Sequence, residues 1–231
     1  PHHCITPQAM AGGGNGLMPG EVSLACHGVL FMDEFNLFST KTVEVLRQPM
    51  ESGHILIDRV NGKVEYPADF MLVAAMNPCK CGYYPDRNKC SCTPAQVRAY
   101  FGRLSRPLLD RIDVCVQVPR IKYEDMVYDG KDLYTNEYMR STVERVFNIQ
   151  KERFADEKYS LNSSIPAADV SRYCILDREA ENLMNSIYDS CDLSARGYHK
   201  LLKVARTIAD IDGSEYIMAE HICEASGYRM V

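Results

Sequence analysis

The first half of the chain contains short, largely apolar runs separated by more polar segments. Residues 28–32, 70–76 and 114–118 are three such runs. Short runs without a polar face are typical of strands that are buried on both faces of a sheet. Helices are expected from about Ser39 and from Thr93, which is followed by proline and then by glutamine at the third helical position. The pattern therefore predicts an α/β sheet flanked by helices.

A β-hairpin is predicted between the first two runs. Ile55 and Ile57 alternate with polar residues, as do Val64 and Tyr66, and Asn61-Gly62 lies between the two segments. Asn-Gly is a preferred dipeptide of two-residue hairpin turns, because both residues adopt positive φ readily. We therefore expect two antiparallel strands joined by a turn at Asn61-Gly62.

Helical spacing replaces the strand pattern beyond about residue 120. A helix is expected over residues 138–154, with Val143, Val146, Phe147 and Phe154 forming its apolar stripe. Further helices are expected at residues 177–188, at residues 201–209 with a stop before Gly213, and at residues 222–225.

These patterns predict two domains, a partial α/β core at residues 1–125 and a small all-α domain at residues 126–231. The 231 residues, 46% hydrophobic and 25% charged, have the composition of a soluble globular protein. No apolar run approaches the roughly 18–20 residues that span a bilayer, and no secretory signal begins the chain. We therefore expect no membrane partner and a cytoplasmic location, where the ten cysteines stay reduced.

The net charge of −5 hides a basic stretch. Residues 79–111 contain seven basic and only two acidic side chains. An acidic total argues against a protein coated in nucleic-acid-binding charge, but it does not describe local fields. The basic stretch is either a solvated face or a contact for nucleic acid.

Two carboxylates follow the first apolar run. Asp33 and Glu34 come directly after residues 28–32 and are expected at the carboxyl edge of the sheet, where open α/β sheets bind ligands. In a nucleotide hydrolase the first acid holds Mg²⁺ through its water shell, and the second orients or deprotonates the attacking water. The alternative is an ordinary strand followed by a solvated turn.

Two further polar residues have comparable positions. Asn77 follows the second run, where its amide could contact a γ-phosphate or the attacking water, or could simply begin a turn before Pro78. Arg111 lies between an apolar anchor and the third run, which suits a rigid, projecting cation that binds phosphate oxygens. The alternative for Arg111 is a surface ion pair with Asp110 or Asp113.

Four cysteines are clustered as two close pairs. Cys79 and Cys81 are separated by a short loop from Cys90 and Cys92. Two such pairs can supply the tetrahedral sulfur ligands of a structural Zn²⁺ ion, although C-x-C is tighter than the usual C-x₂-C spacing. The alternatives are four reduced thiols on a loop, or two disulfides formed during handling. His2 and His3, beside Cys4, are expected to be solvated or structural.

Taken in order, these features resemble the AAA+ ATPases of the magnesium chelatase family, and within it the ComM/YifB-type competence proteins. Ser194-Ala195-Arg196, which opens a helix in the second half, completes the set. The other sequence segments on which the resemblance rests are Pro1-His2-His3 and residues 19–25, 28–34, 45–51, 74–79, 108–113 and 204–210. Together they extend over nearly the whole chain.

The resemblance implies a role for each matching residue. Asp33 and Glu34 would be the Walker B pair, Asn77 the first sensor, Arg111 the arginine finger that serves a neighbouring subunit, and Arg196 the second sensor on a helical lid. ATP and Mg²⁺ would be the substrate and cofactor, and a hexameric ring of identical chains the assembly. The hairpin would face the central pore of that ring, where Arg59 and Lys63 could touch the phosphates of a DNA strand.

One family motif is absent from this sequence. Nothing matches G-x-x-x-x-G-K-[ST], the loop that cradles the β- and γ-phosphates, and the glycines of residues 12–16 lack the following lysine. The family carries this loop upstream of the Pro1-His2-His3 phrase. We therefore expect this chain to be the C-terminal part of a longer ATPase and to bind ATP poorly by itself.

Three functions remain open from the sequence. An ATP-driven ring motor acting on DNA is the first, and the Cys79–Cys92 segment and the hairpin favour it. A chelatase subunit that drives insertion of Mg²⁺ into a porphyrin is the second. A non-catalytic, zinc-stabilised interaction module is the third, and the presence of all five implied site residues argues against it.

Overall fold

The computed structural model describes the chain except for residues 15, 60–61, 120, 122, 124–133 and 230–231. The described residues divide into two compact units, Pro1–Ile112 and Asp113–Val231. The predicted domain boundary, between residues 125 and 126, lies outside the described residues. None of the helices in the described ranges combines the length and the apolar character that a membrane span requires.

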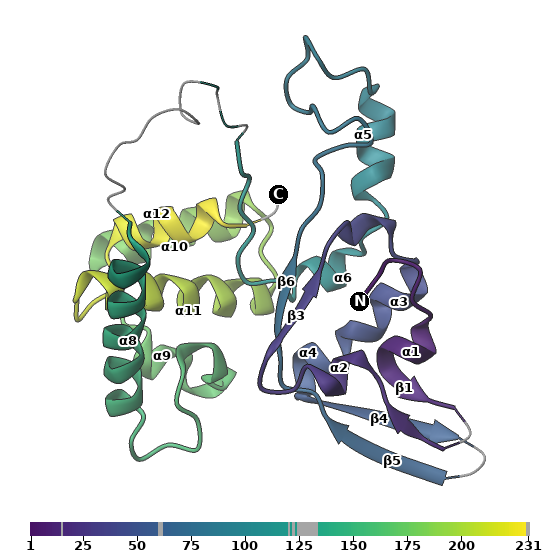
Figure 1. The fold of residues 1–231 in the computed structure, drawn as a ribbon. Helices are drawn as coiled ribbons and strands as arrows, with labels where there is room; N and C mark the ends of the chain where they lie inside the picture. Colours follow the sequence, from purple (N-terminus) through teal and green to yellow (C-terminus); the bar gives the residue numbers. More distant parts are fainter. Residues whose placement is uncertain (15, 60–61, 120, 122, 124–133, 230–231) are drawn as a thin grey trace. The chain divides into compact units, whose positions relative to one another are not determined.

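The first unit is a mixed α/β unit built on a parallel strand pair (Figure 1). Its elements are α1 (Pro7–Ala11), β1 (Gly12–Gly13), β2 (Met18–Pro19), α2 (Glu21–Leu24), β3 (Val29–Met32), η1 (Phe35–Leu37), α3 (Thr40–Glu44), η2 (Val45–Arg47), α4 (Pro49–Ser52), β4 (His54–Arg59), β5 (Gly62–Pro67), β6 (Met71–Ala74), α5 (Pro94–Phe101) and α6 (Arg106–Leu109). With the helical second unit, this confirms the predicted fold class, an α/β core with a parallel sheet followed by an all-α region.

The parallel pair consists of β3 and β6, in a register that runs from Val29 opposite Met71 to Met32 opposite Ala74. The prediction that these strands are buried on both faces is wrong. Met32 is fully buried in the core of the first unit, but Val29 and Phe31 are 56% and 53% exposed. Alternate residues of a strand point to opposite faces, so the described part of the chain covers only one face of this pair.

The predicted third strand at residues 114–118 is also wrong. No strand is present at described residues 113–119, and Val116 and Val118 are largely exposed. The N–H of Cys115 donates instead to the carbonyl of Tyr228, 2.7 Å away in the second unit. An apolar run becomes a strand only when a neighbouring strand accepts its backbone hydrogen bonds, and here a helix end takes one of them.

The predicted helix starts are confirmed. The hydroxyl of Ser39 accepts the N–H of Thr42 at 3.1 Å, and α3 begins at the next residue. Val43 and Leu46 are buried. Thr93 forms a complete capping box with Gln96, in which each side chain accepts the other residue's N–H. These caps fix where α3 and α5 leave the loops that precede them.

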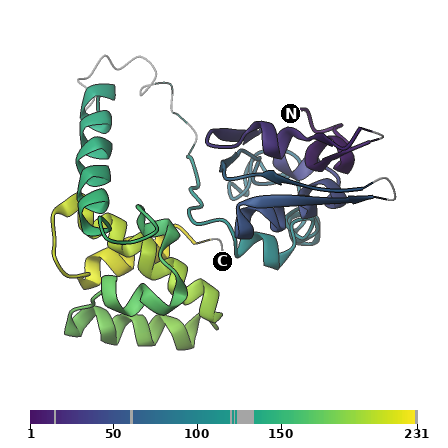
Figure 2. The ribbon, with the colours of Figure 1, turned by 90° about the horizontal axis from the view of Figure 1, so that it is seen from below.

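The predicted hairpin is confirmed as β4 and β5, but Gly62, which was predicted in the turn, pairs with β4, so each residue of β4 lies opposite a residue two positions earlier than a turn at Asn61-Gly62 implies. Ile55 lies opposite Tyr66, and Arg59 lies opposite Gly62. Gly62 therefore belongs to β5, while residues 60–61, including the Asn61 of the predicted turn, lie outside the described residues. Figure 2 shows the two strands as a long ribbon that extends away from the helices of the first unit.

The second unit is all helical. Its elements are α8 (Asn136–Arg153), η3 (Asn162–Ser164), η4 (Ala167–Asp169), α9 (Val170–Tyr173), α10 (Arg178–Ser190), α11 (Ala195–Asp212) and α12 (Ala219–Gly227). The helices predicted in this half are present, and α11 ends before Gly213, which adopts the left-handed conformation of a C-terminal cap.

The apolar stripe predicted for α8 is only half right. Val146 and Phe154 are buried, but Val143 and Phe147 are 67% and 47% exposed. The buried polar residue Gln150 lies between Val146 and Phe154 at helical spacing, and its side chain accepts the N–H of Asn162 at 2.9 Å. The inner face of α8 therefore includes the polar residue Gln150, which the pattern of apolar residues in the sequence does not identify.

A charged network supports that polar position. Asp210 and Arg206 of α11 are almost fully buried and form an ion pair at 3.1 Å. Arg153 of α8 donates to both carboxylate oxygens of Asp210, and the amide of Asn162 donates to one of them at 2.8 Å. A buried carboxylate that is satisfied on all sides fixes the register of the helices around it.

Candidate active site and metal centre

The carboxyl ends of β3 and β6 bring three predicted site residues to one edge of the sheet. The ladder continues just past the strand ends, because the N–H of Ala75 donates to Met32 at 3.0 Å and the N–H of Phe35 donates to Ala75 at 2.9 Å. Asp33 and Glu34 lie between these rungs on one chain segment, and Asn77 follows Ala75 by two residues on the other. The parallel register therefore places the carboxylates and the amide on neighbouring loops that leave the sheet at the same level.

The turn at Asp33 and Glu34 has an unusual backbone. Glu34 has φ 50° and ψ 43°, the left-handed conformation that side-chain-bearing residues rarely adopt. The carboxylate of Asp33 accepts the N–H of Glu34 at 2.8 Å and so stabilises the turn. Asp33, Glu34 and Asn77 are all solvent-exposed. Strained residues of this kind are common at functional sites, where they aim a side chain.

The side chain of Glu34 has a partner that the sequence analysis missed. Nδ1 of His3 lies 3.3 Å from Oε2 of Glu34. We expected His3 to be solvated or structural, and its side chain is 31% exposed. No periodic or spacing signal connects positions so far apart; the one available hint was that the Pro1-His2-His3 phrase belongs to the family pattern.

The residues after Glu34 are anchored in the core. Phe35 and Asn36 are buried, and Nη1 of Arg103 donates to the carbonyl of Asn36 at 3.3 Å. Arg103 lies just after α5, the helix that follows the cysteine loop. The turn that presents Glu34 is thus supported by the segment that leaves the cysteine cluster.

Arg111 is not the projecting cation that the sequence suggested. Its side chain is 10% exposed, and its guanidinium pairs with the carboxylate of Glu51 and donates to the carbonyl of Pro107 at 2.5 Å. Neither Asp110 nor Asp113 is a recorded partner of Arg111. Glu51 lies in α4, so this ion pair joins the residues after α6 to a helix that lies far away in the sequence.

The two basic residues predicted to contact nucleic acid lie together on the hairpin. Arg59 ends β4 and Lys63 is near the start of β5, and both are exposed. Lys63 lies opposite Asp58 in the register. A carboxylate beside Lys63 reduces the local positive potential, so Arg59 carries more of it.

Arg196 lies in the second unit, in the first turn of α11. The hydroxyl of Ser194 caps this helix by accepting the N–H of Gly197 at 3.1 Å. The side chain of Arg196 is exposed. Its predicted role depends on how the two units are arranged around a nucleotide, and it stays a prediction.

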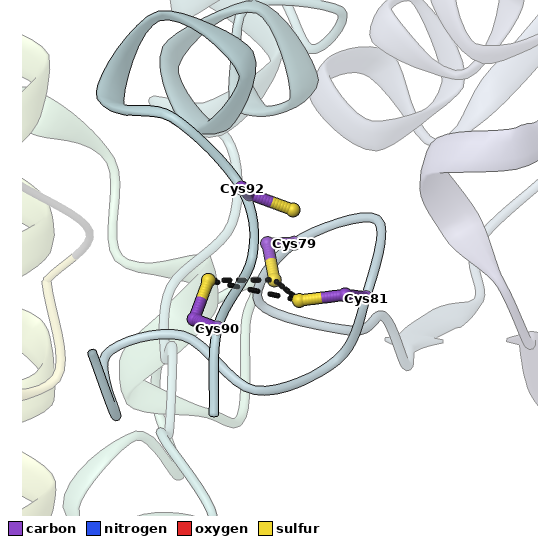
Figure 3. Close-up of side chains that lie close together, drawn as sticks. All are labelled: Cys79, Cys81, Cys90 and Cys92. Carbon is purple, nitrogen blue, oxygen red and sulfur yellow. Dashed lines mark hydrogen bonds between the residues drawn. The ribbon is translucent and has the colours of Figure 1, made fainter. Parts of the chain in front are cut away.

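The four clustered cysteines converge in the structure (Figure 3). Their sulfur atoms all lie within 4.8 Å of one another, with Sγ separations of 3.3 Å for Cys79–Cys81, 3.6 Å for Cys81–Cys90 and 3.8 Å for Cys79–Cys90. A tetrahedral zinc ion with Zn–S bonds of about 2.3 Å separates its sulfurs by about 3.8 Å. All four cysteines are free thiols. The donor set and its spacing therefore fit one zinc ion.

Backbone donors lower the pKa of a cysteine thiol in this cluster, and burial raises it. The N–H of Tyr83 lowers the pKa of Cys81 to about 6. Burial raises the pKa of Cys90 to about 11. The N–H of Tyr84 also donates to the sulfur of Cys79, at 3.5 Å. Backbone donors that stabilise a thiolate are common around structural metal sites, because the thiolate is the ligand.

The cysteine cluster begins at the candidate active site. Cys79 is fully buried and follows Asn77 by two residues. Any ion held by the four sulfurs would therefore also fix the end of the loop that carries Asn77. Hard oxygen donors at the sheet edge suit a magnesium ion, and sulfur donors next to them suit zinc.

Comparisons with known proteins agree with this architecture. Residues 1–126 match the family model of magnesium chelatase, subunit ChlI, and residues 134–229 match that of the ChlI C-terminal region. The chain is 40% identical over 229 residues to the competence protein ComM of Haemophilus influenzae, covering 99% of this chain and 44% of ComM.

Two other relatives show how the similarity is distributed. The chain is 39% identical over 231 residues to the protein YifB of Escherichia coli, covering 100% of this chain and 45% of YifB. Identity to the magnesium-chelatase 38 kDa subunit of Chlorobaculum parvum is 24% over 227 residues, covering 95% of this chain and 56% of that subunit. The chain thus spans less than half the length of ComM and YifB, and it belongs to the magnesium chelatase family.

Proposed function

We propose that this chain is the C-terminal part of an ATP-hydrolysing AAA+ ring motor that acts on DNA in the cytoplasm. The observation that carries the proposal is the register of β3 and β6, which brings Asp33, Glu34 and Asn77 to one edge of the sheet. Asp33 would hold Mg²⁺ through its water shell, and the ion would neutralise charge on the β- and γ-phosphates. Glu34 orients the attacking water and accepts its proton.

Asn77, Arg196 and Arg111 complete the proposed site around the γ-phosphate. Asn77 contacts the γ-phosphate or the attacking water, and Arg196 brings the helical unit to the nucleotide. Arg111 serves the site of a neighbouring subunit, for which its guanidinium must exchange Glu51 for a phosphate. A cation of this kind stabilises the charge that develops during phosphoryl transfer. This division of roles requires a ring of identical subunits, which we propose to be a hexamer.

The proposal also includes a phosphate-binding loop. The chain has no G-x-x-x-x-G-K-[ST] motif, and it spans 44% of ComM and 45% of YifB. We therefore assign the grip on the β- and γ-phosphates to a segment outside these 231 residues. The experiments below use the complete protein for this reason.

A structural zinc ion at Cys79, Cys81, Cys90 and Cys92 completes the proposed site. Four thiolates satisfy a tetrahedral zinc ion without an open position, so this ion would have a structural and not a catalytic role. It would close the loop between β6 and α5, whose residues are mostly polar. The loop would then hold Asn77 on one side and α5 on the other.

DNA is the proposed polymer because of the hairpin and of the relatives. The hairpin presents exposed Arg59 and Lys63 beside its turn, and ComM, to which the chain is 40% identical, is a competence protein. Basic side chains on a projecting hairpin can follow the phosphates of a single strand with little sequence preference.

The test compares DNA-stimulated with porphyrin-stimulated ATP hydrolysis by the complete protein. We expect single-stranded DNA to stimulate turnover, and we expect Arg59→Ala combined with Lys63→Ala to weaken oligonucleotide binding about tenfold. Each lost phosphate contact should reduce the salt dependence of binding by roughly 0.7 in log–log slope. The measurement is fluorescence anisotropy at several salt concentrations.

Matched charge removal on the second unit provides the control. Lys151→Ala combined with Lys158→Ala also removes two basic side chains, at the end of α8 and beyond it, and should leave DNA binding unchanged. Stimulation by a porphyrin with Mg²⁺, and not by DNA, would favour a chelatase subunit instead. Absence of ATP hydrolysis under both conditions would favour an inert interaction module.

A further inference from the structure

The contact between His3 and Glu34 links the N-terminal segment to the turn that follows β3. Nδ1 of His3 lies 3.3 Å from Oε2 of Glu34, and 31% of the His3 side chain and 52% of the Glu34 side chain remain exposed. Exposed ion pairs add little to stability. The contact is therefore better understood by what it does to the position of the carboxylate.

His3 is itself held in place from two sides. Its ring is 4.1 Å from the ring of His2, centroid to centroid, and meets the ring of Phe38 edge-on at 6.5 Å. The backbone behind it is fixed as well, since the N–H of Ile5 donates to His2 at 3.0 Å and the hydroxyl of Thr42 donates to Ile5 at 3.2 Å. The imidazole therefore has a defined location relative to α3.

Glu34 has a fixed backbone and a long side chain. The left-handed φ and the bond from its N–H to Asp33 determine where the Cα–Cβ bond points. The rotatable bonds of the side chain still allow many carboxylate positions. Within the described residues, His3 is the one ion-pair partner recorded for this carboxylate.

We propose that His3 is a positioning residue that fixes the carboxylate of Glu34 for the attacking water. This role rests on the proposed ATPase function, and it adds to that function a residue from a different chain segment. A ring nitrogen 3.3 Å from one carboxylate oxygen restricts the rotamers of the glutamate side chain. The other carboxylate oxygen then faces one direction. His3 does not touch the nucleotide or the water in this arrangement.

The experiment distinguishes the effect of the ring nitrogen of His3 from the effect of its aromatic ring. His3→Phe keeps an aromatic ring against Phe38 but cannot donate, whereas His3→Asn places an amide N–H near the position of Nδ1. In the complete protein we expect His3→Phe to lower kcat for ATP by about tenfold, because small displacements of a catalytic group have large effects on rate. KM and ATP affinity should stay within about twofold, and His3→Asn should recover most of the lost rate.

A second histidine provides the matched control. His54 of β4 has its own carboxylate partner, Glu65, with Nε2 and Oε1 3.5 Å apart. His54→Phe should leave kcat unchanged in the absence of DNA. Wild-type kcat in His3→Phe would overturn the positioning role, and so would a folded His3→Asn variant as slow as His3→Phe.

A spectroscopic measurement distinguishes this proposal from the ATPase proposal itself. In protein labelled with ¹⁵N-histidine, the Nδ1 signal of His3 should shift in Glu34→Ala. No ATP turnover by the wild type, together with that shift, would overturn the proposed function and the positioning role with it. Normal turnover with an unshifted signal would overturn the positioning role alone.

Discussion

Replacing Glu34 with glutamine should remove nearly all ATP hydrolysis by the complete protein while leaving ATP binding in place. Glutamine has the shape of glutamate but cannot accept the proton of the attacking water. Loss of a general base typically costs 10²–10⁴-fold in rate, so we expect kcat to fall by about that factor. Steady-state turnover and titration with a fluorescent ATP analogue measure the two quantities on the same preparation.

Glu220→Gln is the matched control for this change. Glu220 lies in α12 with 78% of its side chain exposed, far in sequence from the sheet edge. Its replacement removes the same charge and should change neither turnover nor ATP affinity. If Glu34→Gln kept more than about a tenth of the wild-type kcat, Glu34 could not be the base, and the assignment of the sheet edge as the active site would lose its main support.

Loss of the cysteine cluster should have the largest effect on the stability of the first unit. Combining Cys79→Ser with Cys90→Ser removes one sulfur from each half of the cluster. Structural zinc sites contribute apparent binding free energies of roughly 10–16 kcal/mol in small peptides, so part of that stabilisation should disappear. We expect zinc content to fall from about one ion per chain to near zero and the midpoint of thermal unfolding to fall with it. Mass-spectrometric metal analysis and differential scanning calorimetry provide the two readings.

The chain contains its own control for this experiment. Cys191 and Cys223 are exposed cysteines of the second unit, outside the cluster. Cys191→Ser combined with Cys223→Ser should keep the zinc content and the unfolding midpoint of the wild type. A wild-type protein that contains no zinc after purification without chelators would contradict the metal assignment, as would a Cys79→Ser, Cys90→Ser variant that still binds one ion.

Local chemistry explains which parts of the fold could be predicted from the sequence. The capping residues Ser39 and Thr93 satisfy backbone donors within one turn, so they marked the helix starts correctly. The alternation around Ile55 and Ile57 marked the hairpin in the same way. The cysteine cluster was visible because its ligands lie close together in the sequence as well as in space.

Long-range partners explain the failures. The run at residues 114–118 resembles a strand in composition, but whether a strand forms depends on a neighbour that the run itself does not specify. Likewise, the face of β3 that carries Phe31 looks like core in the sequence, because an apolar pattern does not reveal what packs against it. The correct partner of Arg111 was Glu51 and not the adjacent acids, since a turn after α6 decides the pairing.

The candidate site contains residues that could be predicted from the sequence and one that could not. Asp33, Glu34 and Asn77 were recognisable because each directly follows an apolar run, and parallel strands bring such positions to one edge. His3 was not recognisable, because its contact with Glu34 is formed by a segment that contacts Phe38, just after η1, and Thr42 of α3. A contact between distant chain segments is therefore harder to find from the sequence than residues that follow an apolar run.

The most direct test of the central claim is a structure of the complete protein with Mg²⁺ and a non-hydrolysable ATP analogue. Our account predicts that the γ-phosphate lies at the carboxyl edge of β3 and β6, with Asp33 in the water shell of the ion and the amide of Asn77 within hydrogen-bonding distance of the phosphate. The carboxylate of Glu34 should face the position of the attacking water. A nucleotide bound elsewhere, with these three side chains directed away from its phosphates, would contradict the account.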